Sequence, residues 1–321
     1  MGNDKRMKVG IIGLGAIGER LIQKFEQHPE TQITAICDTN QDRLQMFKQR
    51  LQTAEGYTDY HTLLKSADVD LVHIAVPPKF HHEVLLSAAA AGKHILCEKP
   101  LANTYDEAAE MLAAVEKTGV VHGIHFPLAY SSAVDELIRQ TADNELGRIK
   151  RVELNLQLPL WPRTWQQNPW IAGREQGGFV REVTPHFIEV ILRAFGNVNR
   201  VESLIDYPEN GTDCETAIIA RAELEGGIPF LVNGLSGIAV KETFELTLYG
   251  DKKTLHFKNW TFLEESNYEQ TGLPIEIIPN DESSLLISEL VKAVKGEKAN
   301  LVTFKEGLKI QEVLEQLLNR R

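Results

Sequence analysis

The chain has 321 residues, of which 43% are hydrophobic and 25% are charged, and this composition excludes a disordered, fibrous or small disulfide-stapled protein. Its net charge of -11 leaves no broad basic surface for a phosphate backbone, which excludes nucleic acid as the main partner. Three widely spaced cysteines and the lack of a long apolar segment predict a protein of the reducing cytoplasm that is not bound to a membrane.

The length predicts two domains, and the first 120 residues have the pattern of a parallel sheet. Short apolar runs alternate there with amphipathic stretches, which is typical of βαβ units. We expect strands at Lys8–Ile12, Gln32–Cys37, Leu71–Val76, His94–Cys97 and Val120–Ile124. We expect helices at Ala16–Gln27, Asp42–Arg50, His81–Ala91 and Tyr105–Lys117. This order predicts a doubly wound, parallel Rossmann domain over residues 1–125.

The pattern changes after about residue 148. Arg151–Leu158 alternate between polar and apolar residues, and turns at Gly226-Gly227 and Gly250-Asp251 indicate antiparallel hairpins. The other expected elements are the strands Ala217–Leu224, Ile228–Asn233, Thr243–Tyr249 and Thr254–Phe257 and the helices Ser284–Lys295 and Phe304–Leu318. We therefore expect residues 126–321 to form an α/β domain for substrate binding and oligomerisation. It would contain a large, open, mostly antiparallel sheet, and its C-terminal helix could pack back on the first domain.

A glycine-rich segment of the form GxGxxG follows the first expected strand and opens the first expected helix. Such glycines permit a tight turn and let the backbone approach a pyrophosphate, which the helix N-terminus then binds. A kinase loop or a plain turn is the alternative, but no HRD or DFG sequence follows. The segment predicts dinucleotide binding by Gly13, Gly15, Ala16, Ile17 and Gly18.

Asp38 ends the second expected strand, 20 residues after Gly18. Its carboxylate could accept hydrogen bonds from the ribose hydroxyls of a dinucleotide, and the alternative role is that of a helix N-cap. A carboxylate at this position would repel the 2′-phosphate of NADP, so NAD is the expected cofactor. The guanidinium of Arg43 on the following helix could still reach a phosphate, which leaves NADP possible.

Two further motifs end strands at the edge of the predicted parallel sheet, where ligands of such sheets bind. Pro77 and Pro78, followed by His81, come after the third expected strand, and Glu98-Lys99 come after the fourth. Placing charged residues directly after a buried strand costs free energy, which favours a functional role for Glu98 and Lys99. We assign Pro77, Pro78, His81, Glu98 and Lys99 to the cofactor site. A structural turn is the alternative for the two prolines.

A segment near the middle of the chain carries three of the four tryptophans, at Trp161, Trp165 and Trp170. Such rings can stack on the C–H faces of a sugar while polar groups bind its hydroxyls, and a loop packed on the sheet or on another subunit is the equal alternative. The polar candidates are Arg163, Asn168 and Arg174. His122 and His125 have the spacing of a weak metal pair, but no ligand cluster accompanies them, so we expect no metal.

Taken together, Gly13–Gly18, Pro77-Pro78 with His81, and Glu98-Lys99-Pro100 resemble the glucose-fructose oxidoreductase and inositol dehydrogenase (Gfo/Idh/MocA) family. Gly177–His186 is similar to the family's Gly-Gly segment and Asp-x-x-x-His helix, so the resemblance covers both halves of the chain. It implies a two-domain NAD(P)-dependent oxidoreductase acting on sugars or polyols. It also implies a catalytic group formed by Lys99, Glu182 and His186, with Glu182 replacing the family's aspartate.

The chemistry of these three residues fits the oxidation of a carbinol. A base must remove the hydroxyl proton as hydride leaves carbon, and histidine, present here as His186, is the residue type that titrates near neutral pH. Lys99 could stabilise the developing alkoxide, and Glu182 could orient His186 if both share one face of a helix that begins near Glu182. A structural histidine and a solvated carboxylate are the alternatives. We predict that Lys99 and His186 also contact the substrate, together with Trp161, Arg163, Trp165, Trp170 and Arg174.

The sequence therefore predicts an NAD-dependent enzyme that transfers a hydride between the cofactor and a CH–OH carbon of a sugar or polyol. NAD-dependent glycoside hydrolysis is an alternative, because it uses the same hydride chemistry transiently. A dinucleotide-binding redox sensor without catalysis is another alternative. The unfilled face of the antiparallel sheet predicts a homodimer or homotetramer.

Overall fold

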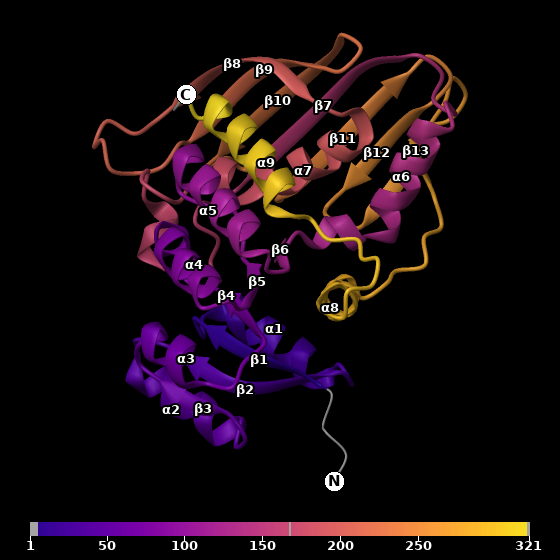
Figure 1. Cartoon of the computed structure of the whole chain (residues 1–321). Coiled ribbons are helices and arrows are strands. Elements are labelled where there is room, and N and C mark those ends of the chain that lie inside the picture. Colours follow the sequence, from indigo (N-terminus) through magenta and orange to yellow (C-terminus); the bar gives the residue numbers. More distant parts are fainter. Residues whose placement is uncertain (1–5, 167, 320–321) are drawn as a thin grey trace. The chain divides into compact units, whose positions relative to one another are not determined.

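The computed structural model describes residues 6–166 and 168–319, and the chain divides into two compact units (Figure 1). The first unit contains the chain up to Phe126 together with Asp281–Leu308. The second unit contains Pro127–Asn280 together with the chain from Lys309 onward. Each unit is built on its own sheet.

The first unit has a six-stranded sheet in the order β3-β2-β1-β4-β5-β6, with every neighbouring pair parallel. The strand order reverses between β1 and β4, and in sheets of this kind ligands bind at such a reversal, at the carboxyl ends of the strands. The prediction of a doubly wound sheet is confirmed. The strands are β1 (Met7–Ile12), β2 (Thr31–Cys37), β3 (Glu55–Tyr57), β4 (Leu71–Ile74), β5 (His94–Cys97) and β6 (His122–Ile124).

Helices connect these strands, and local signals fix several of their ends. Thr104 and Glu107 form a capping box that begins α5, and Gly119, with a φ of +68°, ends it. The helices of this unit are α1 (Ala16–Gln27), α2 (Gln41–Arg50), α3 (Tyr60–Ser66), α4 (His81–Ala90), α5 (Tyr105–Thr118) and α8 (Glu282–Val294), with a short 3-10 turn η1 (Pro78–Phe80).

Helix α8 returns to the first unit from late in the sequence and packs against α1. The Nζ of Lys24 lies 2.6 Å from the Asp281 carboxylate, and the Nε2 of His28 lies 3.1 Å from the Ser288 hydroxyl. The apolar face of α8, which includes Leu286, is buried. The first unit therefore needs this late segment to complete its core.

The second unit has an eight-stranded sheet in the order β14-β13-β12-β11-β7-β10-β9-β8. Its neighbouring pairs are antiparallel apart from β7 and β10, which run parallel, so the prediction of a mostly antiparallel sheet is confirmed. The strands are β7 (Ile149–Leu158), β8 (Val198–Asp206), β9 (Ala217–Leu224), β10 (Ile228–Ser236), β11 (Thr243–Gly250), β12 (Thr254–Lys258), β13 (Phe262–Ser266) and β14 (Leu273–Pro274).

Helices lie over one face of this sheet, as Figure 1 shows for α6, α7 and α9. Alternate residues of β7, from Val152 to Leu158, are buried on that face. On other strands, the large apolar side chains of Leu204, Ile219 and Leu235 are exposed. The helical elements are α6 (Ser132–Ala142), α7 (Phe179–Phe195), α9 (Phe304–Leu317), η2 (Pro127–Tyr130) and η3 (Pro169–Ala172).

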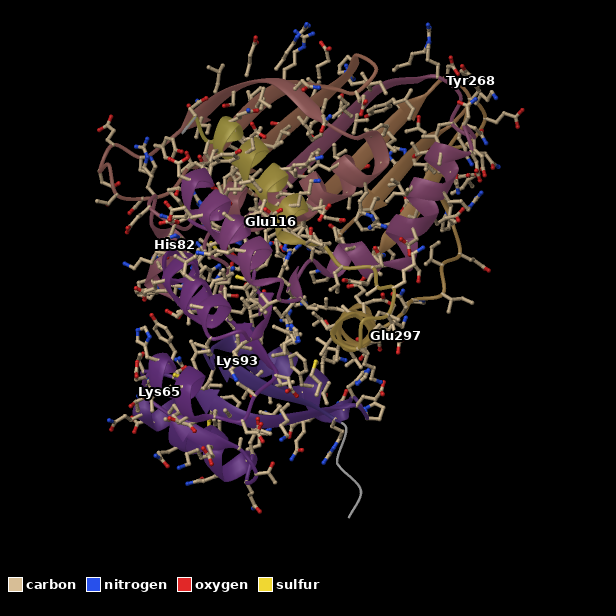
Figure 2. The ribbon with its side chains drawn as sticks, viewed as in Figure 1. Lys65, His82, Lys93, Glu116, Tyr268 and Glu297 are labelled. Atoms are coloured by element: carbon tan, nitrogen blue, oxygen red, sulfur yellow. The ribbon has the colours of Figure 1, made fainter. Side chains whose placement is uncertain are left out.

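Charged and polar side chains cover the outer surfaces of the helices (Figure 2). Lys65 on α3 and Glu116 on α5 are exposed, and so is Glu297 after α8. His82 on α4 lies 2.8 Å from the Glu110 carboxylate on α5 and links the two helices at the surface. Most of the charged residues of the sequence thus remain in contact with water.

Candidate active site

The glycine-rich loop lies between β1 and α1, and two of its glycines have no room for a side chain. Gly13 has a φ of +98°, and a Cβ there would lie 2.5 Å from the Ala75 carbonyl oxygen. A Cβ on Gly18 would lie 2.1 Å from the Gly13 carbonyl oxygen. At Gly15, which caps α1, a Cβ would meet no atom of the described chain within 4 Å, so open space faces the helix N-terminus. The loop and helix can thus receive a pyrophosphate on Ala16, Ile17 and their neighbours.

Asp38 connects this loop with the end of β2. Its Oδ2 accepts a hydrogen bond from the Leu14 N–H at 2.9 Å and lies 3.1 Å from the Arg43 guanidinium. Its Oδ1 accepts a hydrogen bond from the Asn40 N–H at 2.8 Å. Since an ionised carboxylate offers about four acceptor sites, Asp38 retains capacity for a ribose hydroxyl. The N-cap of α2 is Asn40, so Asp38 does not have that role.

His81 lies at the start of α4, completely buried. Its Nδ1 is 3.0 Å from the Pro100 carbonyl, and its Nε2 is 2.9 Å from the Val76 carbonyl. Burial lowers the pKa of His81, and the surrounding carbonyls oppose this effect. The ring therefore ties the loop that contains half-buried Pro77 and buried Pro78 to the loop after β5. His81 can act on a cofactor only through the positions of these two loops.

Glu98 follows β5 and is the centre of a buried cluster that we call the Glu98 cluster: His73, Glu98 and His125. His73 Nε2 and His125 Nδ1 lie 3.0 Å and 2.8 Å from the same oxygen, Oε1 of Glu98. The three residues come from β4 and from the ends of the adjacent strands β5 and β6. No local pattern pairs Glu98 with His73 or His125, because the three residues come from three different strands or strand ends.

The Glu98 cluster holds a buried negative charge next to Lys99 in the chain. Burial opposes ionisation of Glu98, but His125 and His73 outweigh it, and the pKa of the carboxyl lies well below its usual range. The other ring nitrogens, His73 Nδ1 and His125 Nε2, are buried and have no hydrogen-bond partner within the described part of the chain. Lys99 itself is half buried.

Helix α7 carries the other two predicted catalytic residues. From Phe179 to Ile191 every side chain is buried except those of Glu182 and His186, which are four residues apart on one face. A helix otherwise embedded in the core thus presents two polar side chains together. Their shared face fits a role for Glu182 in orienting the imidazole.

The two residues share this face because α7 begins at Phe179, three residues before Glu182, which meets the condition set by the sequence. Glu215 provides the reason: its carboxylate accepts a hydrogen bond from the Val180 N–H at 2.7 Å, at the first turn. Pro185 consequently lies inside α7. There its ring removes one backbone hydrogen bond, a loss that a buried helix tolerates through its packing.

The tryptophan-rich loop forms a stacked cluster around Arg163. The guanidinium lies 5.2 Å from the centre of the Trp161 ring, 5.9 Å from Trp165 and 5.3 Å from Phe244, and its Nε donates to Glu242 at 2.7 Å. Trp161 also donates from Nε1 to the Ile171 carbonyl at 3.2 Å. The cluster therefore holds two of the predicted tryptophans and the predicted arginine in one place.

The other predicted sugar contacts in this loop are placed differently. Arg174 stacks on the ring of Tyr207 at 3.7 Å, so it has its own aromatic partner. Asn168 is exposed and begins η3, while Trp170 lies half buried within that turn. The loop therefore brings together only part of the predicted set.

The fourth tryptophan, Trp260, contacts His186. Their ring centres are 5.4 Å apart with an angle of 86° between the planes, an edge-to-face arrangement. Trp260 also packs on Phe187 and Phe244, at 5.2 Å each. Sequence analysis missed Trp260 because it stands alone in a hairpin turn, far from the other tryptophans.

Glu189 lies one turn after His186, and only 3% of its surface is exposed. Burial raises the pKa of Glu189 to about 7, although the Arg193 guanidinium lies 3.5 Å away. A carboxyl with this shift binds its proton more tightly in the folded protein than in the unfolded chain, where its pKa is near 4.5. Ionisation of Glu189 therefore favours unfolding.

The free energy of unfolding is expected to fall by roughly 3 kcal/mol through Glu189 as the pH rises from about 4.5 to about 7, and to change no further above that range. The variant Glu189→Gln cannot ionise and should lack this loss. Urea unfolding of both proteins at pH 5 and pH 8 measures the difference. Equal changes between the two pH values in both proteins would contradict the assignment.

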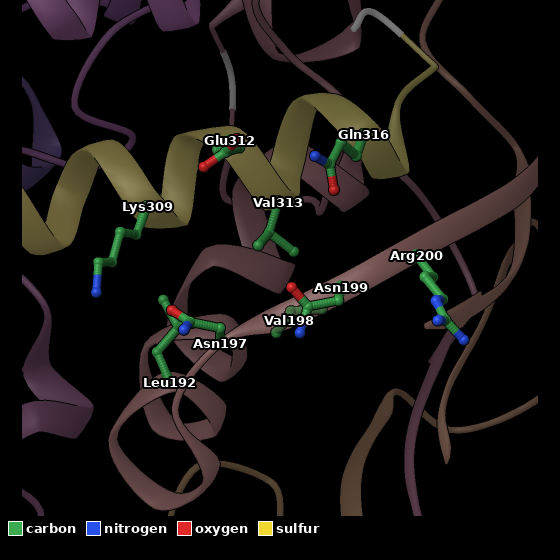
Figure 3. Close-up of a pocket in the computed structure, with 9 residues that line it drawn as sticks. All are labelled: Leu192, Asn197, Val198, Asn199, Arg200, Lys309, Glu312, Val313 and Gln316. Carbon is green, nitrogen blue, oxygen red and sulfur yellow. The ribbon is translucent and has the colours of Figure 1, made fainter. Parts of the chain in front are cut away.

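A separate cavity of about 330 Å³ lies in the second unit at the C-terminal end of α7 (Figure 3). Its wall comes from α7, the start of β8 and α9, and includes Lys309, Glu312 and Arg200. The described residues that line it include none of those predicted from the sequence to bind a ligand.

Histidine, cysteine and acidic side chains do not gather into a metal site in residues 6–166 and 168–319, where no group of three or more of them could hold an ion. His122 and His125 have separate partners, since His122 Nδ1 accepts from the Phe304 N–H at 3.2 Å. No helix within the same two ranges combines the length and the apolar character needed to cross a membrane.

Comparison with known proteins identifies both parts of the chain. Residues 7–126 match the model of an oxidoreductase family with an NAD-binding Rossmann fold, GFO_IDH_MocA. Residues 138–320 match the C-terminal alpha/beta domain of the same oxidoreductase family. The two matches include the glycine-rich loop, the Glu98 cluster and α7.

Curated relatives and a solved structure agree with these matches. The chain is 34% identical over 143 residues to the uncharacterized oxidoreductase YrbE of Bacillus subtilis, covering 44% of this chain and 42% of YrbE. It is 27% identical over 190 residues to myo-inositol 2-dehydrogenase of Thermotoga maritima, covering 59% and 55%. These alignments span about half the length of the relatives. The fold matches WlbA dehydrogenase from Bordetella pertussis, solved with NADH and UDP-GlcNAcA, with a TM-score of 0.86, 19% identity and coverage of 98% and 96%.

Proposed function

Because the chain belongs to the Gfo/Idh/MocA oxidoreductase family, whose first domain is an NAD-binding Rossmann fold, we propose that it transfers a hydride between NAD and a CH–OH or carbonyl carbon of a sugar or polyol. The observation that carries this proposal is the face of α7, where Glu182 and His186 alone interrupt a run of buried side chains between Phe179 and Ile191. The substrate class is supported by relatives such as myo-inositol 2-dehydrogenase.

The residues of the first unit fit a dinucleotide. Open space at Gly15 admits a pyrophosphate over the α1 N-terminus, and Asp38 has acceptor capacity for the ribose. Pro77 and the loop after Glu98 border the carboxyl edge of the sheet, and His81 holds them together. When bound, the nicotinamide supplies the hydride acceptor.

In the proposed reaction, His186 takes the hydroxyl proton of the substrate as hydride leaves carbon. The ammonium of Lys99 donates a hydrogen bond to the same oxygen and stabilises its developing negative charge. Glu182 orients the imidazole from one turn earlier on α7. Trp161, Trp165, Trp170, Arg163 and Arg174 belong to the substrate-binding part of the chain. We assign this part to residues 126–321, of which Asp281–Leu308 also completes the core of the first unit, and the dinucleotide site to residues 1–125.

A substrate screen tests the proposed function. Cyclic polyols, aldoses and sugar acids are offered with NAD and with NADP, and the absorbance of reduced nicotinamide is followed. At least one compound is expected to reduce the cofactor in proportion to product. Hydrolysis without net reduction would indicate transient hydride chemistry instead, and dinucleotide binding without any turnover would indicate a sensor.

The expected cofactor preference rests on Asp38. Wild-type protein should bind NAD more tightly than NADP, and Asp38→Ala should narrow the difference by about tenfold or more, because it removes the repelling carboxylate and releases Arg43 from its 3.1 Å contact. Fluorescence titration with both cofactors measures this change. Arg43→Ala is the matched control, since it should leave the preference for NAD in place. A tenfold preference of the wild type for NADP would contradict the role of Asp38.

We also propose that the protein is a cytoplasmic homodimer or homotetramer that associates through the open face of the eight-stranded sheet. Leu204 and Ile219 are directly opposite each other on β8 and β9, with 76% and 64% of their surfaces exposed. Light scattering should therefore give two or four times 36.0 kDa, and Ile219→Lys should shift the mass towards the monomer. A 36.0 kDa wild-type particle at micromolar concentration would reject the proposal.

A further inference from the structure

The turn that carries Trp260 has an unusual backbone. Asn259 and Trp260, between β12 and β13, have φ angles of +49° and +71°. Left-handed conformations are rare for residues other than glycine, and for a bulky side chain they persist only where the surroundings impose them. Positive φ at both central residues is typical of the type I′ turn that joins hairpin strands, and Trp260 stands at the second of these positions, where glycine is the preferred residue.

Two sets of contacts hold the turn. The Thr261 N–H donates to the Lys258 carbonyl at 3.1 Å and closes it. Asn259 pairs with Phe244 on β11, its N–H donating to the Phe244 carbonyl at 2.8 Å and its Oδ1 accepting from the Phe244 N–H at 3.1 Å. The backbone under Trp260 is therefore fixed from two sides.

The turn places the indole ring of Trp260 against α7. Trp260 contacts Phe187 and Phe244, which are both buried, and it also forms the edge-to-face pair with His186. Through this contact, His186, one of the two polar side chains on the α7 face, packs against the ring of Trp260. A perpendicular aromatic contact restrains rotation of the imidazole about its side-chain bonds.

We propose that Trp260 is a positioning residue, which holds the imidazole of His186 in the orientation needed to accept a proton from the substrate. This inference deepens the proposed function and rests on it. Trp260 touches no reacting atom in this scheme and acts only through His186. Its loss should lower kcat by about 10- to 100-fold and change KM little, as small misplacements of a reacting group do.

Kinetics test the positioning role. Trp260→Leu should show the loss in kcat, and Trp260→Phe, which keeps an aromatic ring, should restore kcat to within about threefold of the wild type. Tyr268→Leu is the matched control, because Tyr268 is an aromatic residue with 90% of its surface exposed on a neighbouring loop (Figure 2). Wild-type kcat in Trp260→Leu, or an equal loss in Tyr268→Leu, would overturn the proposal.

A second measurement needs no substrate. A protonated imidazole quenches the fluorescence of an adjacent indole, so acidification from about pH 8 to about pH 5, the range in which imidazoles take up a proton, should lower the emission of the wild type. Both Trp260→Phe and His186→Asn should abolish this change, while Tyr268→Leu should keep it. Retention of the change in Trp260→Phe would overturn the proposal even if a substrate were never found. A failed substrate screen with the fluorescence change intact would reject the proposed function and leave the ring contact standing.

Discussion

Replacement of His186 or Lys99 by alanine is expected to lower kcat by roughly 10²–10⁴-fold, the range typical of general acid–base groups. His186 would no longer accept the hydroxyl proton, and Lys99 would no longer stabilise the oxygen that loses it. The measurement is kcat on the best substrate of the screen. Affinity for NAD should change little in His186→Ala, since α7 belongs to the second unit and the glycine-rich loop to the first.

Two comparisons sharpen this test. Residues that act as one unit are not additive, so the double variant should be hardly worse than the poorer single variant. Glu182→Gln should cost less than His186→Ala if the carboxylate only orients the imidazole. Turnover near that of the wild type in His186→Ala would place the catalytic base elsewhere.

Glu98→Ala is expected to lower the free energy of unfolding by about 3–5 kcal/mol, the usual cost of breaking a buried charged pair by removing one partner. His73 and His125, which are both buried, would lose the oxygen that both of them contact. Urea unfolding at neutral pH measures this loss.

The chain offers a matched control for the Glu98 cluster. Glu110 also contacts a histidine, His82, at 2.8 Å, but 67% of the Glu110 side chain is exposed. Glu110→Ala should therefore cost less than about 1 kcal/mol. Equal losses in the two variants would contradict the importance of burial at Glu98.

A fall in pH should also lower the free energy of unfolding through Glu98. Because the pKa of this carboxyl is lowered in the folded protein, its contribution to stability is present above about pH 4.5 and is lost as the pH falls towards its folded value. Glu98→Gln should lack this part of the acid sensitivity.

Local signals in the sequence were sufficient to predict many of the helices and strands of the first unit. The helix α1 was predicted with its observed bounds, since Gly13–Gly18 punctuate the chain and an amphipathic pattern follows at once. Short elements gave no such signal: β3 has three residues and α3 has seven, so each repeats its pattern too few times to be recognised. In the second unit, α6 has an amphipathic pattern with buried Val134 and Leu137, but this helix was not predicted.

The remaining differences between the predicted and the observed structure come from contacts between distant parts of the chain. The start of α7 at Phe179 depends on Glu215, and the Glu98 cluster depends on His73 and His125. The contact between Trp260 and His186 joins a hairpin turn to a helix. No local pattern encodes these pairs, because each depends on a tertiary fold that brings the two partners together.

The return of the late segment to the first unit affects the order in which the protein can mature. The Ile124 N–H of β6 donates to the Val302 carbonyl at 2.8 Å, and α8 covers α1. A nascent chain released only as far as Phe126 has all six strands but lacks both partners, while Pro127–Asn280 still await translation. We therefore expect the dinucleotide-binding half to complete its core only after most of the other half has been made, and until then its uncovered apolar surface favours aggregation. A fragment cut at Phe126 should consequently aggregate, whereas a fusion of that fragment to Asp281–Leu308 through a flexible linker should not.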